Sequence, residues 1–225
     1  MNPPQDTGYA LEYAYYLLGN VLNKTVLDLG CGAGENSVVL ARRAAKVVGL
    51  DISTDLVEIA QRRAQVHGQA VQFIVTSAYA TGLPGESVDV VFGEAILHHL
   101  DLELAANEIR RILRPGGYAV FVEPIRDSAT VRFLRRLMPS RQPDLSPYEY
   151  PLTQKQLVSF AQGFELSEVR RFDSPFLQLA GRTRFLLKVL PRDERVRAID
   201  RWLLTAVPWI EHFASVIVFR IHCKR

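Results

Sequence analysis

Three glycines and one aspartate in the first quarter of the chain have the types and spacing of a ligand-binding turn. Gly30, Gly32 and Gly34 follow the apolar run VLDL and form the pattern GxGxG. Glycine has no Cβ, so it suits a backbone that turns sharply or that a ligand approaches closely. Asp51 ends the next apolar run, and a carboxylate there can accept hydrogen bonds from both hydroxyls of an adenosine ribose. The spacing differs from GxGxxG, which disfavours a pyrophosphate turn and a nicotinamide-dependent oxidoreductase.

The elements that must position these residues alternate between strand and helix. Apolar runs predict strands over 24–30, 46–53, 71–77, 87–95 and 118–124, and periodic patterns predict helices over 35–44, 56–68 and 101–113. Asp55 and Glu58 have the spacing of a capping box at the second helix, and Gly68 marks its end. Strand–helix–strand units of this length predict a doubly wound α/β fold with a parallel sheet.

The second half of the chain loses this regular alternation. We expect a basic helix over 127–139, a proline-rich loop over 140–153, a helix over 153–164 and strands over 165–173 and 215–225. The stretch between the last two strands is helical in pattern and strongly amphipathic. We therefore predict one domain over 1–225, with an N-terminal helical segment at 1–23. Two insertions, at 125–152 and 175–214, are expected to form a cap.

Four motifs in register resemble the class I S-adenosylmethionine-dependent methyltransferases, specifically a type 11/25-like small-molecule group. They are VLDLGCGAG (26–34), VVGLDIS (47–53), LPGESVDVVFGEAILHHL (83–100) and EIRRILRPGGYAVFVEP (108–124). The resemblance covers roughly the first 125 residues. It implies a Rossmann-like methyltransferase fold whose last strand is antiparallel. It also implies S-adenosyl-L-methionine as the cofactor and S-adenosyl-L-homocysteine as the product.

The resemblance implies a role for each matching residue. The glycine loop would hold the methionine part of the cofactor, Asp51 the ribose, and Ile52 one face of the adenine. Ser77 and Ala78 would meet the adenine edge, although the family usually has an acid where this chain has Ser77. The remaining cofactor-binding candidates are Asn36, in the first turn of the helix after the glycines, Glu94, at the end of the fourth strand, and Tyr9.

Tyrosines are crowded near the N-terminus, at positions 9, 13, 15 and 16. In such enzymes this segment often folds over the cofactor. Tyr9 or Tyr13 would then lie against the sulfonium, because an aromatic face attracts a cation. The alternative is an amphipathic helix that packs its own tyrosines, and we expect this for at least two of the four.

Methyl transfer from a sulfonium is an in-line displacement, so positioning supplies most of the catalysis. An oxygen, nitrogen or carbon acceptor can also need a base. The catalytic candidates are His98 and His99, just past the fourth strand, together with Glu94. One histidine can instead brace the loop, and Glu94 can be an ordinary exposed acid. Glu123, before Pro124, is a second residue on the acceptor side. The scattered histidines and cysteines form no metal-ligand pattern, so we expect no metal site.

The expected acceptor is a small, partly apolar molecule, and the 175–214 insertion is its candidate lid. Packing on the main domain is expected to account for most of the apolar surface of this insertion. A further alternative is a dimer interface or a membrane-surface helix, with Arg182, Arg184 and Lys188 toward phosphates. Either a monomer or a homodimer fits the sequence. A protein acceptor stays open, and a cofactor-binding regulatory or scaffold protein without turnover is the competing class.

Composition is that of an ordinary globular protein, with 48% hydrophobic and 23% charged residues among 225. Residues 1–124 carry 9 Lys/Arg against 14 Asp/Glu, and residues 125–225 carry 18 against 10. The basic residues of the second half are dispersed without an aromatic-interleaved motif, which disfavours a nucleic-acid acceptor. No apolar run reaches membrane-spanning length and no secretion signal opens the chain, so we expect a cytoplasmic protein.

Overall fold

The computed structural model describes residues 3–43, 45–125, 151–173 and 193–223. The first half contains α1 Ala10–Leu18, β1 Thr25–Leu29, α2 Glu35–Arg42, β2 Lys46–Asp51, α3 Thr54–Val66, β3 Val71–Val75, β4 Val88–Glu94, η1 Leu97–His99, α4 Leu102–Ile112 and β5 Leu113–Pro124. The second half contains α6 Gln154–Ala161, β6 Phe164–Phe172, α9 Asp193–Ala206, η2 Pro208–Phe213 and β7 Val216–Cys223. The predicted alternation of strands and helices is confirmed.

One seven-stranded sheet runs through the molecule in the order β3-β2-β1-β4-β5-β7-β6. Strands β1 to β5 are parallel, and β7 pairs antiparallel with both β5 and β6. The expected doubly wound, Rossmann-like fold with an antiparallel last strand is therefore confirmed. Because parallel strands end at the same edge, the turns after β1, β2, β3 and β4 lie side by side.

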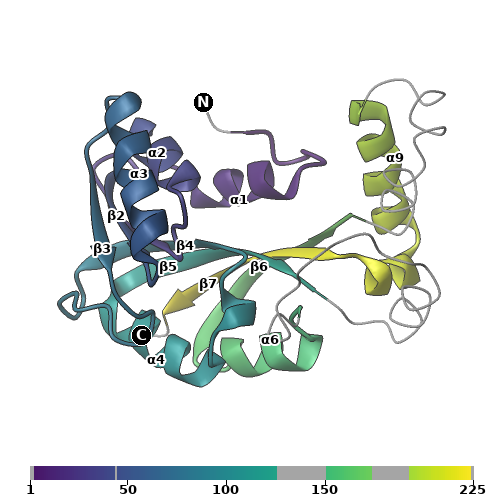
Figure 1. Cartoon of the computed structure of the whole chain (residues 1–225). Helices are drawn as coiled ribbons and strands as arrows, with labels where there is room; N and C mark the ends of the chain where they lie inside the picture. The colour runs from purple at the N-terminus through teal and green to yellow at the C-terminus, as the bar shows by residue number, and fades with distance from the viewer. Residues whose placement is uncertain (1–2, 44, 126–150, 174–192, 224–225) are drawn as a thin grey trace.

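Helices cover both faces of the sheet (Figure 1). α1, α2 and α3 lie on one face, and α4 and α6 lie on the other. Each layer has its own apolar core: Leu18, Leu40 and Phe92 belong to the first, while Ile109, Phe121 and Phe160 belong to the second. Apolar side chains on both sides of the central strands explain why those strands read as continuous hydrophobic runs.

The structure differs from the sequence prediction at the starts of two elements, α3 and β5. The predicted capping box at Asp55 and Glu58 is wrong: Ser53 is the N-cap of α3, and its Oγ accepts a hydrogen bond from the Leu56 N–H. Ser53 lies two residues after β2 ends and has the extended backbone of an N-cap directly before α3, so Asp55 already lies inside the helix. β5 begins at Leu113 rather than at 118, since the chain after α4 pairs at once with β4 through Leu113 and Val88.

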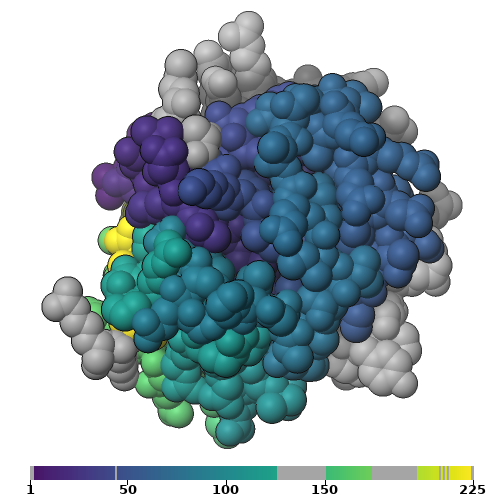
Figure 2. Space-filling model, turned by 90° about the vertical axis from the view of Figure 1, so that its left-hand side faces the viewer, coloured from purple at the N-terminus to yellow at the C-terminus, as the bar shows by residue number. Residues whose placement is uncertain are grey.

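The two predicted insertions are described only in part. The helix expected over 127–139 and the three basic residues at 182, 184 and 188 lie outside the described residues. Within 175–214 the structure describes α9 and η2, which stand apart from the two helical layers at the right of Figure 1. Figure 2 shows the β3 side of the molecule, where the blue segment with α2 and α3 lies above the teal segment with α4.

Candidate active site

A cavity of about 470 Å³ opens at the carboxyl edge of the parallel strands. It has the size of an ordinary small-molecule site. Its walls come from the ends of β1 and β2, the loop after β3 and the turn after β4: Gly30, Leu50, Asp51, Ile52, Thr76, Ser77, Ala78, Tyr79, Ala95, Ile96, His99 and Leu100. Six of the sequence-predicted site residues are thereby brought together, namely Gly30, Asp51, Ile52, Ser77, Ala78 and His99.

The three glycines of the loop serve different purposes. All have positive φ, of 69°, 51° and 82° for Gly30, Gly32 and Gly34, a region that favours glycine. A Cβ at Gly30 would lie 2.5 Å from the Ile96 side chain, and a Cβ at Gly34 would lie 2.8 Å from the Ala60 Cβ. A Cβ at Gly32 would meet nothing within 4 Å. Packing within the protein therefore explains Gly30 and Gly34, whereas the space beside Gly32 is open.

Asp51 ties the glycine loop to the end of β2. Its Oδ2 accepts a hydrogen bond of 2.9 Å from the Gly32 N–H, and its Oδ1 accepts one of 2.9 Å from the Ser53 N–H. Each carboxylate oxygen has a second lone pair, so the side chain can still accept from a ligand in the cavity. Beside it, Ile52 is 78% exposed. An exposed apolar side chain at the cavity rim is suited to stack on a planar ring.

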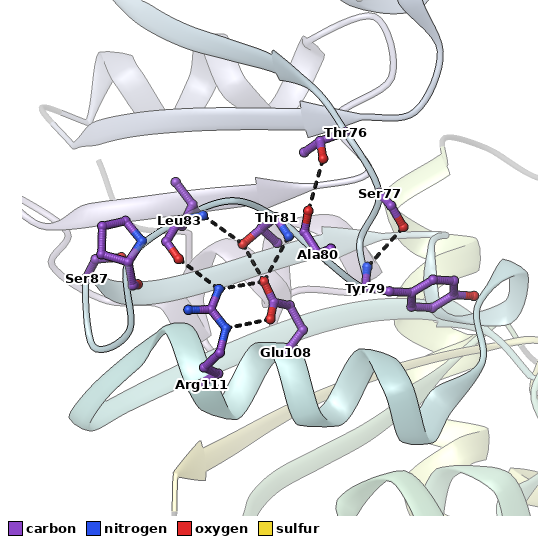
Figure 3. Close-up of polar contacts among 10 residues, drawn as sticks. Thr76, Ser77, Tyr79, Ala80, Thr81, Leu83, Ser87, Glu108 and Arg111 are labelled. Carbon is purple, nitrogen blue, oxygen red and sulfur yellow. Dashed lines mark hydrogen bonds and ion pairs between the residues drawn. The ribbon is translucent and has the colours of Figure 1, made fainter.

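The loop after β3 is fixed from below by a buried carboxylate (Figure 3). Glu108 of α4 accepts hydrogen bonds from the N–H and Oγ1 of Thr81 at 2.8 and 2.6 Å and forms a bidentate pair with Arg111. These hydrogen bonds, with that of Arg111 first, lower the pKa of Glu108 to about 2. At the cavity end of the loop, the Ser77 Oγ accepts from the Tyr79 N–H, and the Tyr79 hydroxyl accepts from the Asp101 N–H.

Two carboxylates lie behind the glycine loop, each held by one residue of the first turns of α2. Ser37 donates to the fully buried Asp28, with 2.5 Å between oxygens, and Asn36 donates to Glu94 across 2.8 Å. Burial raises the pKa of Asp28 to about 7, against the stabilising Ser37 hydrogen bond, and the nearby Glu94 raises it further. Asn36 and Glu94 are thus joined as a pair beside the loop, although neither lines the cavity.

Glu123 organises the turn that carries the two histidines. It is fully buried at the end of β5, and its Oε1 accepts hydrogen bonds from the Ile96 and Leu97 N–H groups at 2.9 and 2.7 Å. Its Oε2 lies 2.9 Å from the Nδ1 of His98. The ring centroids of His98 and His99 are 4.0 Å apart. His98 therefore faces the β5 side, while His99 faces the cavity.

The N-terminal tyrosines do not line the cavity. The guanidinium of Arg197 lies 4.0 Å from the Tyr9 ring centroid, so the expected contact of Tyr9 with a sulfonium stays a prediction. Tyr13 packs against Phe172, and Tyr15 stacks on Phe92. Both are buried, which confirms that at least two of the four tyrosines serve packing.

Two features are absent from the part of the chain that the structure describes. It contains no group of three His, Cys, Asp or Glu side chains arranged for a metal ion. None of the helices in this part combines the length and hydrophobicity that a membrane crossing requires.

Sequence comparison identifies a known domain in the first half. A family described as "Methyltransferase domain" matches residues 27–121. The chain is 32% identical over 166 residues to a ubiquinone biosynthesis O-methyltransferase of Cupriavidus pinatubonensis, covering 68% of this chain and 65% of the relative. It is 36% identical over 105 residues to a demethylmenaquinone methyltransferase of Thermus thermophilus, covering 44% and 47%. The chain spans less than two thirds of the length of these curated relatives.

Solved structures share the fold over nearly the whole chain. A geranyl diphosphate C-methyltransferase from Streptomyces coelicolor, in complex with Mg²⁺, geranyl diphosphate and S-adenosyl-L-homocysteine, matches with a TM-score of 0.64 at 15% identity. The match covers 94% of this chain and 79% of that one. A SAM-dependent methyltransferase from Aquifex aeolicus matches with a TM-score of 0.63 at 16% identity, covering 99% and 95%.

Proposed function

The chain belongs to the class I S-adenosylmethionine-dependent methyltransferase family, and from this premise we propose that it transfers a methyl group to a small, partly apolar acceptor. One observation carries the proposal. Along the sheet edge, the ends of β3, β2, β1 and β4 present Ser77 and Ala78, then Asp51, then the glycine loop, then Glu94. This is the linear order of adenine, ribose and methionyl group in the cofactor.

The described residues fit that cofactor. Gly32 leaves open space where a side chain would otherwise project, and Asp51 keeps lone pairs available at the cavity. Ile52 offers an exposed apolar face beside Ser77 and Ala78. In the proposed arrangement the loop backbone holds the methionyl group, Asp51 holds the ribose hydroxyls, and Ile52 packs on the adenine.

When bound, S-adenosylmethionine supplies an electrophilic methyl group on a sulfonium. This chain supplies the base: His98 donates its Nδ1–H to the buried carboxylate of Glu123, which leaves Nε2 as the proton acceptor. Glu123 fixes the ring and stabilises the imidazolium that forms when Nε2 takes a proton from the acceptor. In the proposed arrangement the acceptor lies on the β5 side of the cofactor, next to His98 and Glu123. His99 faces the cavity beside the cofactor.

An acceptor with an apolar part is supported by the relatives and by the walls of the cavity. The relatives' names refer to ubiquinone biosynthesis, demethylmenaquinone and geranyl diphosphate, all of which concern molecules with hydrocarbon chains. On the β4 side the cavity wall includes Ala95, Ile96 and Leu100. We propose that the 125–152 and 175–214 segments, with α9 and η2, form a cap over the apolar part of the acceptor.

The test is turnover. Purified protein is incubated with methyl-labelled S-adenosylmethionine and a panel of hydroxylated and aminated apolar compounds, and labelled product is separated by extraction. The proposal expects transfer to at least one class, with kcat reduced about 10²- to 10⁴-fold in His98→Asn, as is typical of losing a general base, and with unchanged affinity for S-adenosylhomocysteine. Binding of the cofactor without turnover across the panel would favour the alternative, a regulatory or scaffold protein that binds the cofactor.

A further inference from the structure

Three side chains from three different elements form a hydrogen-bonded relay behind the glycine loop. The Tyr15 hydroxyl of α1 donates to Asn36 Oδ1 across 2.6 Å. The Asn36 Nδ2 of α2 then donates to Glu94 Oε2 at the end of β4 across 2.8 Å. The Tyr15 ring is buried and stacks on Phe92 with an interplanar angle of 6°. The N-terminal helix is thereby connected to the strand end where the methionyl group is proposed to lie.

The chemistry of the relay allows one arrangement of donors and acceptors. A tyrosine hydroxyl that donates requires the amide oxygen of Asn36, which turns the amide nitrogen toward Glu94. An ionised Glu94 only accepts. One of its oxygens is occupied by Asn36, and its other oxygen, Oε1, has no hydrogen-bond partner among the residues that the structure describes. Glu94 is half-buried, and the hydrogen bond from Asn36 restrains the orientation of its carboxylate.

The surroundings make this oxygen suited to a cation. Burial raises the pKa of Tyr15, and the carboxylates of Asp28 and Glu94 raise it further, so the hydroxyl stays a donor. Asp28 is a second carboxylate and accepts from Ser37, the residue after Asn36. Asp51 accepts from the Gly32 N–H of the glycine loop. The charged groups that act on Tyr15 are Asp28, Glu94 and Arg43. The Arg43 guanidinium donates to the Tyr15 and Gly19 carbonyls and lies 5.7 Å from the Tyr15 ring centroid. Arg43 therefore contacts α1 and its C-cap through these carbonyls and the Tyr15 ring.

We propose that Tyr15 is a positioning residue, which acts through Asn36 to hold Glu94 so that its free oxygen receives the ammonium of the cofactor's methionyl group. This inference rests on the proposed function. It gives the N-terminal helix a part in cofactor recognition through Tyr15, a residue that packs away from the cavity, and not through Tyr9 or Tyr13.

The experiment compares two ligands that differ in the methionyl group. S-adenosylhomocysteine carries the ammonium, whereas 5′-methylthioadenosine keeps the adenine, ribose and thioether and lacks the amino-acid part. Both are titrated calorimetrically into wild type and Tyr15→Phe, which removes only the hydroxyl and keeps the stacking ring. Tyr16→Phe is the matched control: it is the same change one residue along α1, and no side-chain hydrogen bond of Tyr16 is found among the described residues.

We expect Tyr15→Phe to lower the affinity for S-adenosylhomocysteine about threefold to tenfold, the usual effect of one lost hydrogen bond. Its affinity for 5′-methylthioadenosine, and both affinities of Tyr16→Phe, should match wild type. In a Glu94→Gln background, the further change Tyr15→Phe should have no effect on S-adenosylhomocysteine, because its route of action is already removed. If Tyr15→Phe does not fold, Asn36→Ala interrupts the relay at a half-buried position and should give the same selective loss.

Unchanged affinity of Tyr15→Phe for S-adenosylhomocysteine would overturn the inference. An equal loss for both ligands would also overturn it, because that result indicates general damage to the site. Failure of S-adenosylhomocysteine to bind folded wild type is a separate outcome, which refutes the proposed function itself.

Discussion

Replacing Glu108 by glutamine tests how the loop that lines the cavity is held. Glu108 lies with 8% of its surface exposed, and its carboxylate receives the Thr81 and Arg111 hydrogen bonds described above. The glutamine side chain keeps one acceptor oxygen for Thr81 and loses the charge that pairs with Arg111. Since Thr81 follows Ser77, Ala78 and Tyr79 in one loop, we expect a loss of stability together with weaker ligand binding.

The magnitude follows from the pKa of the carboxyl group. A lowering from 4.5 to about 2 corresponds to an upper limit of about 3 kcal/mol of folding free energy. The Arg111 side chain is 44% exposed, and solvent screening reduces this to about 2 kcal/mol. Because the folded-state pKa is depressed, this stability is fully present above pH 4.5 and is lost as the pH falls toward 2.

The assay is urea unfolding at pH 7 and at pH 3, with wild type beside Glu108→Gln. At pH 7 we expect the free energy of unfolding of Glu108→Gln to be about 2 kcal/mol lower than that of wild type, which corresponds to on the order of 4–8 °C in Tm. At pH 3 we expect a clearly smaller difference between the two proteins. Glu58→Gln is the control, since Glu58 faces Arg62 one helical turn away at 3.7 Å but is 58% exposed. The reasoning would be refuted if Glu108→Gln lost no more unfolding free energy at pH 7 than Glu58→Gln does. It would also be refuted if the loss in Glu108→Gln were equally large at pH 3.

Three further outcomes are expected. Asp51→Ala should weaken S-adenosylhomocysteine by about 1–3 kcal/mol in calorimetry, through lost hydrogen bonds to a charged group; equal affinity would mean that the ribose lies elsewhere. Gly34→Ala should lower the free energy of unfolding in urea by about 2 kcal/mol, since its Cβ would lie 2.8 Å from Ala60 at a φ of 82°. Gly32→Ala should lower it by about 1 kcal/mol, since its Cβ meets nothing within 4 Å. Equal losses for the two variants would contradict the packing account. Glu123→Gln should lower kcat about 10- to 100-fold at unchanged S-adenosylhomocysteine affinity, and an unchanged kcat would remove Glu123 from the proton path.

Much of the fold can be predicted from the sequence because the signals for its strands and helices are local. The apolar runs ending at Gly30, Asp51 and Glu94 are strands buried on both faces, and the glycine turn marks the first crossover. Strand identity and order then follow from the βαβ rule and from the family resemblance. The capping-box prediction at Asp55 failed because spacing alone does not reveal that the helix begins at Thr54, with Ser53 as its N-cap.

The contacts of the candidate site are harder to predict from the sequence, because they join residues far apart in the chain. Positions 15, 36 and 94 form one relay, and no spacing rule connects them. Glu123 could be suspected from its position at a strand end, but its hydrogen bonds to the turn after β4 could not. One signal was available for Asp28, a charged residue within an apolar strand, which indicates a buried acid with a partner.

The most direct test of the central claim is calorimetric titration of the purified protein, freed of carried-over ligand, with S-adenosylhomocysteine and with NADH. The proposed site predicts saturable binding of S-adenosylhomocysteine at one site per chain, strongly weakened in Asp51→Ala, and no binding of NADH. Absence of S-adenosylhomocysteine binding to folded protein would contradict the assignment of the cavity to this cofactor.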